Sequence, residues 1–134
     1  MSVFLDTSAL LALLDADEAR HEEARQIWTR LLDTDVPITS SNYVLVETYA
    51  LAQRRLGTAA VRVLADQLLP VVDIEWVARD LHEKAVSALI SANRRELSLV
   101  DATSFEVMRQ RGIDVAFAFD RHFEEAGFDL AGTE

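Results

Sequence analysis

The chain has 134 residues, of which 50% are hydrophobic, four are Gly and two are Pro, so it can bury a core and does not resemble a disordered polypeptide. It contains no cysteine, which excludes disulfides, thiolate metal sites and a cysteine nucleophile and suits a reducing cytoplasm. Its formal net charge of -10, from 23 acidic and 13 basic residues, argues against a protein that coats nucleic acid nonspecifically, although a local basic patch is compatible with it. Because the N-terminus has no basic region and no apolar run reaches about 18 residues, we expect neither a signal peptide nor a membrane span.

The N-terminal segment predicts a buried strand that ends at a carboxylate. Val3-Phe4-Leu5 is a short apolar run, and Asp6 follows it directly. Strong helix formers occupy residues 9–14, so we expect the chain to turn from strand into helix at Thr7-Ser8. Asp6 would then lie at the carboxyl end of a strand, where open α/β sheets bind their ligands. An ordinary N-cap, in which the carboxylate accepts from the first free N–H groups of the helix, explains the same pattern without a function.

The rest of the chain alternates between helical and extended patterns. We expect helices over residues 24–32, 43–55, 59–69, 75–91 and 98–111, and strands over 36–39, 70–74, 115–119 and, at an edge, 128–130. Strands that alternate with helices predict an α/β fold with a parallel sheet covered by helices on both faces. With no repeat, linker or low-complexity tract, residues 1–134 are expected to form one domain.

Glu47 is expected in the middle of the helix over 43–55, where its neighbours at helical spacing are apolar. A glutamate is rarely buried without a partner, so this position calls for a cation, an arginine or a function. The alternative to a functional role is a buried ion pair with Arg54 or Arg121.

Two more carboxylates are expected at the ends of elements. Asp101 lies in the first turn of the helix over 98–111, and Asp120 follows the apolar strand over 115–119. The run Ser98 to Asp101 also matches a capping box, and a turn would explain Asp120, so both have structural alternatives. Ser104, one turn after Asp101, is a candidate supporting hydroxyl that could bond a ligand or its water.

A parallel sheet could bring Asp6, Glu47, Asp101 and Asp120 to one edge. Carboxylates a few ångströms apart repel by roughly 4 kcal/mol per close pair at an effective dielectric near ~20, so bound cations would make such a cluster tolerable. Hard oxygen ligands without cysteine favour Mg²⁺ or Mn²⁺ over Zn²⁺. Such ions suit the hydrolysis of phosphodiester bonds by an activated water, which leaves a 5′ phosphate.

The histidines argue against the metal-free ribonuclease route, which normally needs a histidine or a similar acid and base pair. The three histidines are scattered along the chain, and we interpret His21 and His82 as surface residues.

Four segments together resemble the PIN-domain ribonucleases, most closely the VapC-like toxins of toxin–antitoxin pairs. They are residues 3–9 (VFLDTSA), 46–48 (VET), 99–102 (LVDA) and 119–123 (FDRHF). Their order and spacing and the total length fit that family over essentially the whole chain. The resemblance implies a single PIN-like nuclease domain over 1–134 with a small central parallel sheet of about five strands.

The same resemblance implies the site and the partners. Asp6, Glu47, Asp101 and Asp120 would be the acidic metal cluster, with Thr7 or Ser8 as a supporting hydroxyl. An RNA substrate, a cognate antitoxin that blocks the site and a homodimer are also implied, in the cytoplasm. The chain departs from the family at residue 118, an alanine where many relatives carry Thr or Ser, so one supporting hydrogen bond is not expected here.

We therefore predict a Mg²⁺- or Mn²⁺-dependent endoribonuclease. The candidate phosphate contacts are the arginines Arg94, Arg95, Arg109, Arg111 and Arg121, each of which could equally be a solvated helix charge. One alternative is a receiver-like phosphoacceptor signalling domain, although Lys84, the only lysine, does not follow the last strand. The other is a noncatalytic α/β interaction module, in which the acids serve as caps and ion pairs.

Overall fold

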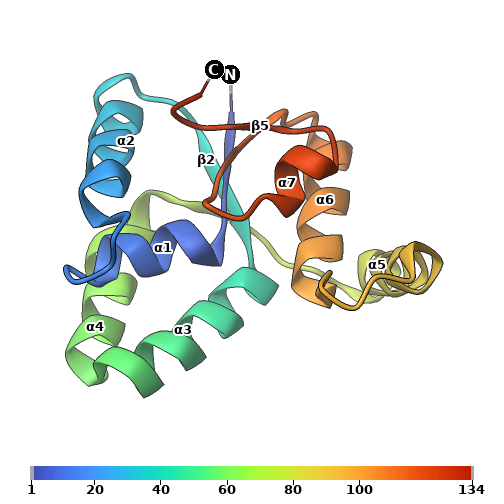
Figure 1. Cartoon of the computed structure of the whole chain (residues 1–134), viewed down its shortest axis with the longest axis horizontal. Coiled ribbons are helices and arrows are strands. Elements are labelled where there is room, and N and C mark those ends of the chain that lie inside the picture. Colours follow the sequence, from blue (N-terminus) through green and yellow to red (C-terminus); the bar gives the residue numbers. More distant parts are fainter. Residues whose placement is uncertain (1, 134) are drawn as a thin grey trace.

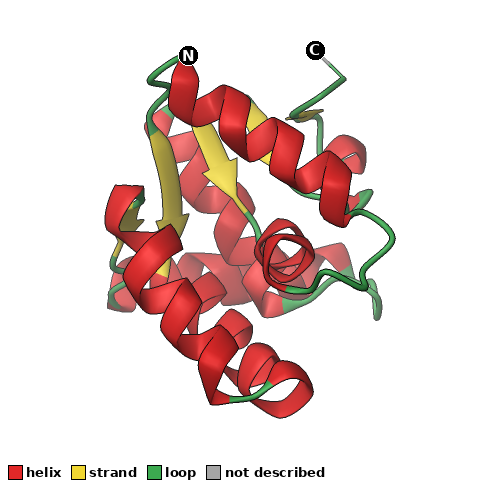
Figure 2. Ribbon diagram, turned by 90° about the vertical axis from the view of Figure 1, so that its left-hand side faces the viewer, coloured by secondary structure: helices red, strands yellow, loops and turns green. Residues whose placement is uncertain are grey.

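A parallel β-sheet lies between two layers of helices in the computed structural model, which describes residues 2–133 (Figure 1, Figure 2). The strand order is β3-β2-β1-β4-β5, and every neighbouring pair is parallel. The strands are β1 (Val3–Leu5), β2 (Ile38–Ser41), β3 (Asp73–Glu75), β4 (Val115–Phe117) and β5 (Asp129–Leu130). The predicted α/β fold with a five-stranded parallel sheet is confirmed.

Helices form the crossovers that parallel strands require. Those before β3 are α1 (Thr7–Leu14), α2 (His21–Asp33), α3 (Asn42–Leu56) and α4 (Thr58–Val63), and those after it are α5 (Arg79–Ala92), α6 (Leu99–Arg111) and α7 (His122–Glu125). Figure 1 shows α1, α2 and α4 on one side of the sheet and α5, α6 and α7 on the other. Within residues 2–133, no helix combines the length and the apolar character needed to cross a membrane.

Strand β1 is the centre of the sheet and the point at which the strand order reverses. The chain runs from β1 outward through β2 and β3, then returns to pair β4 and β5 on the other side of β1. Val3, Phe4 and Leu5 are fully buried, as expected for a strand covered on both faces. A reversal of this kind opens a crevice at the carboxyl ends of the two strands that flank it, here β1 and β4.

Strand β4 ends at Phe117, two residues earlier than predicted. The N–H of Phe119 donates to the Ser8 hydroxyl oxygen at 2.9 Å instead of to a neighbouring strand. Because a side chain of α1 uses this backbone group, residues 118–120 leave the sheet, and Asp120 lies in the connection to α7.

The segment between α4 and β3 is more irregular than predicted. α-helical hydrogen bonding stops at Val63, and a π-helical turn (Leu64–Leu68) and a 3₁₀ turn (Leu69–Val71) follow. Pro70, which lacks an N–H group, lies in the 3₁₀ turn, so the strand predicted over 70–74 begins only at Asp73.

Two other boundaries differ from the prediction. β2 covers Ile38–Ser41 instead of residues 36–39. α5 begins at Arg79 and not at residue 75, because the N–H of Val77 donates to the Asn42 side-chain oxygen at 2.7 Å and keeps this segment outside the helix.

The ring of Phe123 anchors α7 to the core, and we expect it to carry a large part of the stability of this region. It is fully buried, with ring centroids 6.5 Å from Phe4 and 5.1 Å from Phe105. Phe123→Ala should lower the free energy of unfolding in urea by about 3–5 kcal/mol. Trp76→Ala, at a side chain that is 69% exposed, should change it by less than about 0.5 kcal/mol. Similar losses in both variants would contradict this assignment of the core.

Candidate active site

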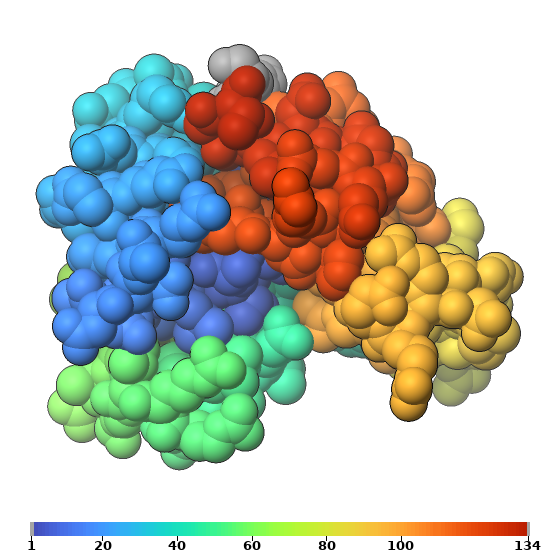
Figure 3. Space-filling view, viewed as in Figure 1, coloured from blue at the N-terminus to red at the C-terminus, as the bar shows by residue number. Residues whose placement is uncertain are grey.

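A pocket lies at the carboxyl ends of β1 and β4, where the strand order reverses. Its lining residues are Asp6, Thr7, Ser8, Leu11, Glu47, Leu51, Arg55, Ser98, Asp101 and Asp120. In Figure 3 the dark blue atoms of the first residues lie recessed between the green α3 and α4 and the orange-red C-terminal segment. All four carboxylates predicted from the sequence therefore line one pocket.

Asp6 is both a helix cap and a wall of this pocket. Its Oδ2 accepts from the Ser8 N–H at 3.1 Å and from the Ser8 hydroxyl at 2.6 Å, so the N-cap interpretation is correct. The same Ser8 oxygen accepts from the N–H of Phe119. Ser8 thus fixes the Asp6 carboxylate against the segment that follows β4.

The Asp6 carboxylate is held in an environment that disfavours its charge. Burial raises its pKa from an ordinary value of 3.8 to about 6, against the lowering effect of the Ser8 hydrogen bonds, and the negative charges of Asp101 and Asp120 raise it further. Its side chain has little contact with water, since the residue is only 4% exposed. A bound cation would relieve both the burial and the repulsion.

Asp101 also combines a capping role with a place in the pocket. It forms a capping box with Ser98, in which the Asp101 N–H donates to Ser98 Oγ at 3.0 Å and the Ser98 N–H donates to Asp101 Oδ2 at 3.4 Å. The residue is 7% exposed. Its Oδ2 additionally lies 3.1 Å from His122 Nδ1.

His122 joins Asp101 to Asp120. Its Nδ1 lies 3.1 Å from Asp101 Oδ2 and 3.1 Å from Asp120 Oδ1, and its backbone N–H donates to Asp120 Oδ1 at 2.9 Å. Burial alone would lower the pKa of His122, but the hydrogen bond with Asp101 and the charges of Asp120, Asp101 and Glu125 outweigh it and raise the pKa. Asp101 and Asp120 therefore favour the protonated form of His122.

Sequence reasoning gave His122 no role in the site. One ligand atom each from Asp101, Asp120 and His122 lies within 4.8 Å of the others, so among the described residues these three form a compact group that could hold a metal ion. Asp6 and Glu47 line the pocket but do not belong to that group. The sequence did contain one signal for this role. His122 follows Asp120 by two residues, a spacing at which both side chains can lie on one side of a turn.

The other two histidines lie at the surface, half-buried and outside the core, and each has a hydrogen-bond partner. His21 Nδ1 lies 2.7 Å from the Ala12 carbonyl oxygen, and His82 Nδ1 pairs with the Tyr43 hydroxyl. Neither lines the pocket.

The remaining predicted side chains divide between the pocket and the helices. Glu47 is half-buried on α3, and it forms no ion pair with Arg54 or Arg121 in the described part of the chain. Thr7 lines the pocket, where its hydroxyl donates to the Val44 carbonyl at 3.4 Å. Ser104 is fully buried and donates to the Val100 carbonyl at 2.8 Å, so the structure does not bring its hydroxyl to the pocket.

The basic residue that lines the pocket is Arg55, which the sequence analysis did not select. Arg111 pairs with Asp73 at 2.7 Å and Glu75 at 2.9 Å, at the end of α6 remote from Asp101. Arg94 and Arg109 line a different cavity, and Arg95 and Arg121 are exposed. None of the five arginines proposed as phosphate contacts is among the lining residues of this pocket.

The donor set fits a hard divalent cation. Four carboxylates and the hydroxyls of Thr7, Ser8 and Ser98 offer mainly oxygen atoms, the ligands that Mg²⁺ and Mn²⁺ prefer. The single imidazole is compatible with Mn²⁺ and less typical of Mg²⁺.

Comparison with known proteins supports a nuclease fold. The family described as PIN domain matches residues 3–129. The 23S rRNA-specific endonuclease VapC20 of Mycobacterium tuberculosis, from strain CDC 1551 / Oshkosh and from strain H37Rv, is 46% identical over 127 residues, which is 94% of this chain and 95% of that protein.

Solved structures also show the PIN-like fold. The crystal structure of M. tuberculosis VapC20, described as a sarcin-ricin loop cleaving toxin, superposes with a TM-score of 0.82 and 46% identity, over 95% of this chain and 96% of that one. FitAcB from Neisseria gonorrhoeae superposes with a TM-score of 0.66 over 96% and 95% of the two chains, at 14% identity, which shows a shared fold alone.

The burial of Asp6 predicts a stability cost that depends on pH. Between about pH 3.8 and pH 6 the unfolded chain loses this proton while the folded chain keeps it, so the stability of the metal-free protein falls as pH rises. The shift corresponds to about 3 kcal/mol at most above pH 6. Asp6→Asn should therefore be more stable than the wild type in urea at about pH 7.5, and its advantage should shrink toward about pH 5.

Asp66→Asn, at an exposed position, is the matched control and should follow the wild-type pH dependence. An Asp6→Asn protein less stable than the wild type at about pH 7.5 would mean that the Ser8 hydrogen bonds outweigh the cost of burial.

Proposed function

The chain belongs to the PIN-domain family, and on that premise we propose that it is a divalent-metal-dependent endoribonuclease. The observation that carries the proposal is the convergence of Asp6, Glu47, Asp101 and Asp120 on one pocket at the reversal of the strand order. The 46% identity to an rRNA-specific endonuclease over nearly the whole chain supports the same activity.

We propose that the four carboxylates, with His122 in its neutral form, hold Mg²⁺ or Mn²⁺. A cation bound there would lower the pKa of a water molecule that attacks the phosphodiester and would stabilise the leaving oxygen. Ser8 orients the Asp6 carboxylate through two hydrogen bonds, and the capping box of α6 orients that of Asp101. These contacts fix the ligands before the substrate arrives, so little reorganisation is needed during the reaction.

The remaining polar groups of the pocket position the substrate. Arg55 lies at the same pocket and is suited to bind the phosphate that flanks the cleaved bond. Thr7 accepts from the Thr48 hydroxyl at 3.1 Å, which ties α1 to α3 and so fixes the wall that carries Glu47.

The biological setting is carried over from the relative. We propose that the chain acts on ribosomal RNA, as the name of the M. tuberculosis relative states for that protein, and that it is the toxin of a toxin–antitoxin pair. A cognate antitoxin, a homodimeric state, a cytoplasmic location and a single nuclease domain over residues 1–134 are part of the same proposal. The family match over residues 3–129 supports the single domain.

Neither alternative drawn from the sequence is favoured. A receiver-like phosphoacceptor site would need a lysine at the acidic pocket, but Lys84 is exposed on α5 and does not line it. A noncatalytic module does not account for two carboxylates buried beside each other when simple caps would leave them at the surface.

Removal of one central carboxylate should abolish cleavage. We expect the purified protein with Mg²⁺ or Mn²⁺ to create discrete new 5′-phosphate ends in total cellular RNA, mapped by sequencing. Asp101→Asn should reduce the rate by at least about 100-fold, and a chelator should do the same. Asp80→Asn, at an exposed position on α5, should cleave as the wild type does. Equal cleavage by the folded Asp101→Asn protein would rule out the proposed mechanism.

Glu47 should tune the affinity for metal without being essential for it. Because it is half-buried and stands outside the compact group, Glu47→Gln should weaken the binding of Mn²⁺ by about 10-fold in calorimetric titration. Glu83→Gln on α5 is the exposed control. Unchanged Mn²⁺ affinity in Glu47→Gln would remove Glu47 from the metal site.

A further inference from the structure

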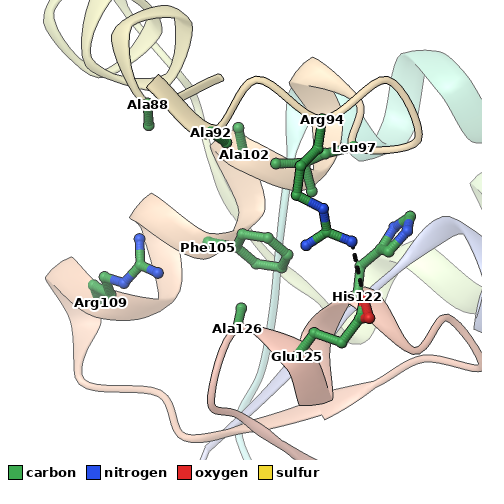
Figure 4. Close-up of a pocket in the computed structure, with 10 residues that line it drawn as sticks. All are labelled: Ala88, Ala92, Arg94, Leu97, Ala102, Phe105, Arg109, His122, Glu125 and Ala126. Carbon is green, nitrogen blue, oxygen red and sulfur yellow. Dashed lines mark hydrogen bonds and ion pairs between the residues drawn. The ribbon is translucent and has the colours of Figure 1, made fainter. Parts of the chain in front are cut away.

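A second cavity, of about 190 Å³, lies between α5, α6 and α7 (Figure 4). His122 lines it, and the same side chain contacts Asp101 and Asp120 through Nδ1. The cavity therefore adjoins the proposed reaction centre through His122, which contacts two of the carboxylates there.

The walls combine an apolar interior with a charged rim. Four alanines, from α5, α6 and the C-cap of α7, leave the space open, and the Phe105 ring lies among them (Figure 4). The rim carries Arg94, Arg109 and Glu125. Such a cavity suits a flat group that has polar edges.

The size of the cavity and the charge around it indicate what it binds. Pockets for drug-sized ligands start at about 300 Å³, so this one admits a single ring system and not a whole nucleotide. Arg94, Arg95 and Arg109 lie in or next to it, although the chain as a whole carries a net charge of -10. Because Arg94 and Arg109 pair with Glu96, Glu125 and Glu106, both hydrogen-bond donors and acceptors surround this cavity, which suits the polar edge of a base.

We propose that this cavity is a subsite for one nucleobase of the RNA substrate, with guanine preferred. The proposal rests on the proposed nuclease function for its place next to the cleaved bond. A base that leaves the stack of the RNA would insert between the alanines and Phe105, as unstacked bases do in sequence-specific RNA recognition.

The preference for guanine follows from the donors and acceptors on the rim. A guanidinium donates two hydrogen bonds to guanine O6 and N7, which suits Arg94. A carboxylate accepts from guanine N1–H and N2–H together, which suits Glu125. Adenine, cytosine and uracil all lack the adjacent pair of N–H donors that the carboxylate would accept from.

Arg94 and Glu125 can release each other and bind a base instead. Arg94 Nη2 lies 3.3 Å from Glu125 Oε1, and their side chains are 41% and 51% exposed, while Arg94 Nε lies 2.9 Å from Glu96 Oε1 and keeps that pair. The dashed line in Figure 4 marks this contact across the edge of the cavity. An ion pair this exposed contributes little to stability, so a base can replace it at small cost.

Arg109 is held by one carboxylate and one aromatic ring. Its Nη1 lies 3.3 Å from Glu106 Oε1, and its guanidinium stands 5.8 Å from the centre of the Phe128 ring. It is suited to remain as a fixed positive charge on the opposite wall.

The proposal is tested first by binding in the absence of metal. Guanosine 5′-monophosphate, inosine 5′-monophosphate and cytidine 5′-monophosphate are titrated into ¹⁵N-labelled protein, and amide shifts over residues 88–126 are followed. We expect the guanine nucleotide to bind at least fivefold more tightly than the inosine nucleotide, which lacks the N2 amine. In Glu125→Gln this difference should disappear. Equal affinities for all three nucleotides in the wild type would overturn the proposal.

A variant that fills the cavity tests the location. Ala88→Leu, which adds bulk inside the cavity, should weaken guanine nucleotide binding at least tenfold, with folding checked by its thermal transition. Ala59→Leu, an exposed alanine on α4 remote from this cavity, should bind as the wild type does. Retained binding in a folded Ala88→Leu protein would overturn the assignment.

Cleavage of an RNA pool of random sequence separates failure of the subsite from failure of the nuclease. We expect wild-type cuts to show guanine enriched at one position near the cut, and Ala88→Leu to cleave without that enrichment. Cleavage with the same base preference in both proteins would overturn the subsite and leave the nuclease intact. If no protein cleaves, the nuclease proposal fails, while the nucleotide titration still decides whether the cavity binds guanine.

Discussion

The burial of negative charge at one edge of the sheet is the constraint on which the rest of this structure depends. Asp6 and Asp101 are 4% and 7% exposed. They approach each other because β1 ends, and α6 begins, at the reversal of the strand order. Buried like charges oppose folding, and the pKa of Asp6, raised to about 6 chiefly by burial, expresses that cost. We propose that this cost is retained because the arrangement is a preformed site for a cation.

The protein offsets part of this cost with its own groups. Ser8 donates two hydrogen bonds to Asp6, and His122 lies between Asp101 and Asp120 with a raised pKa. Ser8 also accepts from the N–H of Phe119, so one hydroxyl connects the carboxyl ends of the two central strands. These hydrogen bonds therefore hold the carboxylates in fixed orientations, which favours electrostatic catalysis.

The fold and the acidic residues could be predicted because their signals are local. A short apolar run before Asp6 and a capping motif at Asp101 are visible in a few residues, and parallel strand topology brings them together. The roles of His122 and Arg55 could not be predicted, because they depend on where α7 and the end of α3 lie relative to the pocket. Likewise β4 is short because Ser8, 111 residues away in sequence, binds the N–H of Phe119.

The central claim is that the pocket of Asp6, Glu47, Asp101 and Asp120 holds a divalent cation. Crystals grown with Mn²⁺ and measured near its absorption edge would test it most directly. We predict an anomalous peak within bonding distance of Asp101 and Asp120, with the Asp6 carboxylate in its direct or water-mediated shell. A pocket without a peak at saturating Mn²⁺, with His122 still between Asp101 and Asp120, would contradict the account.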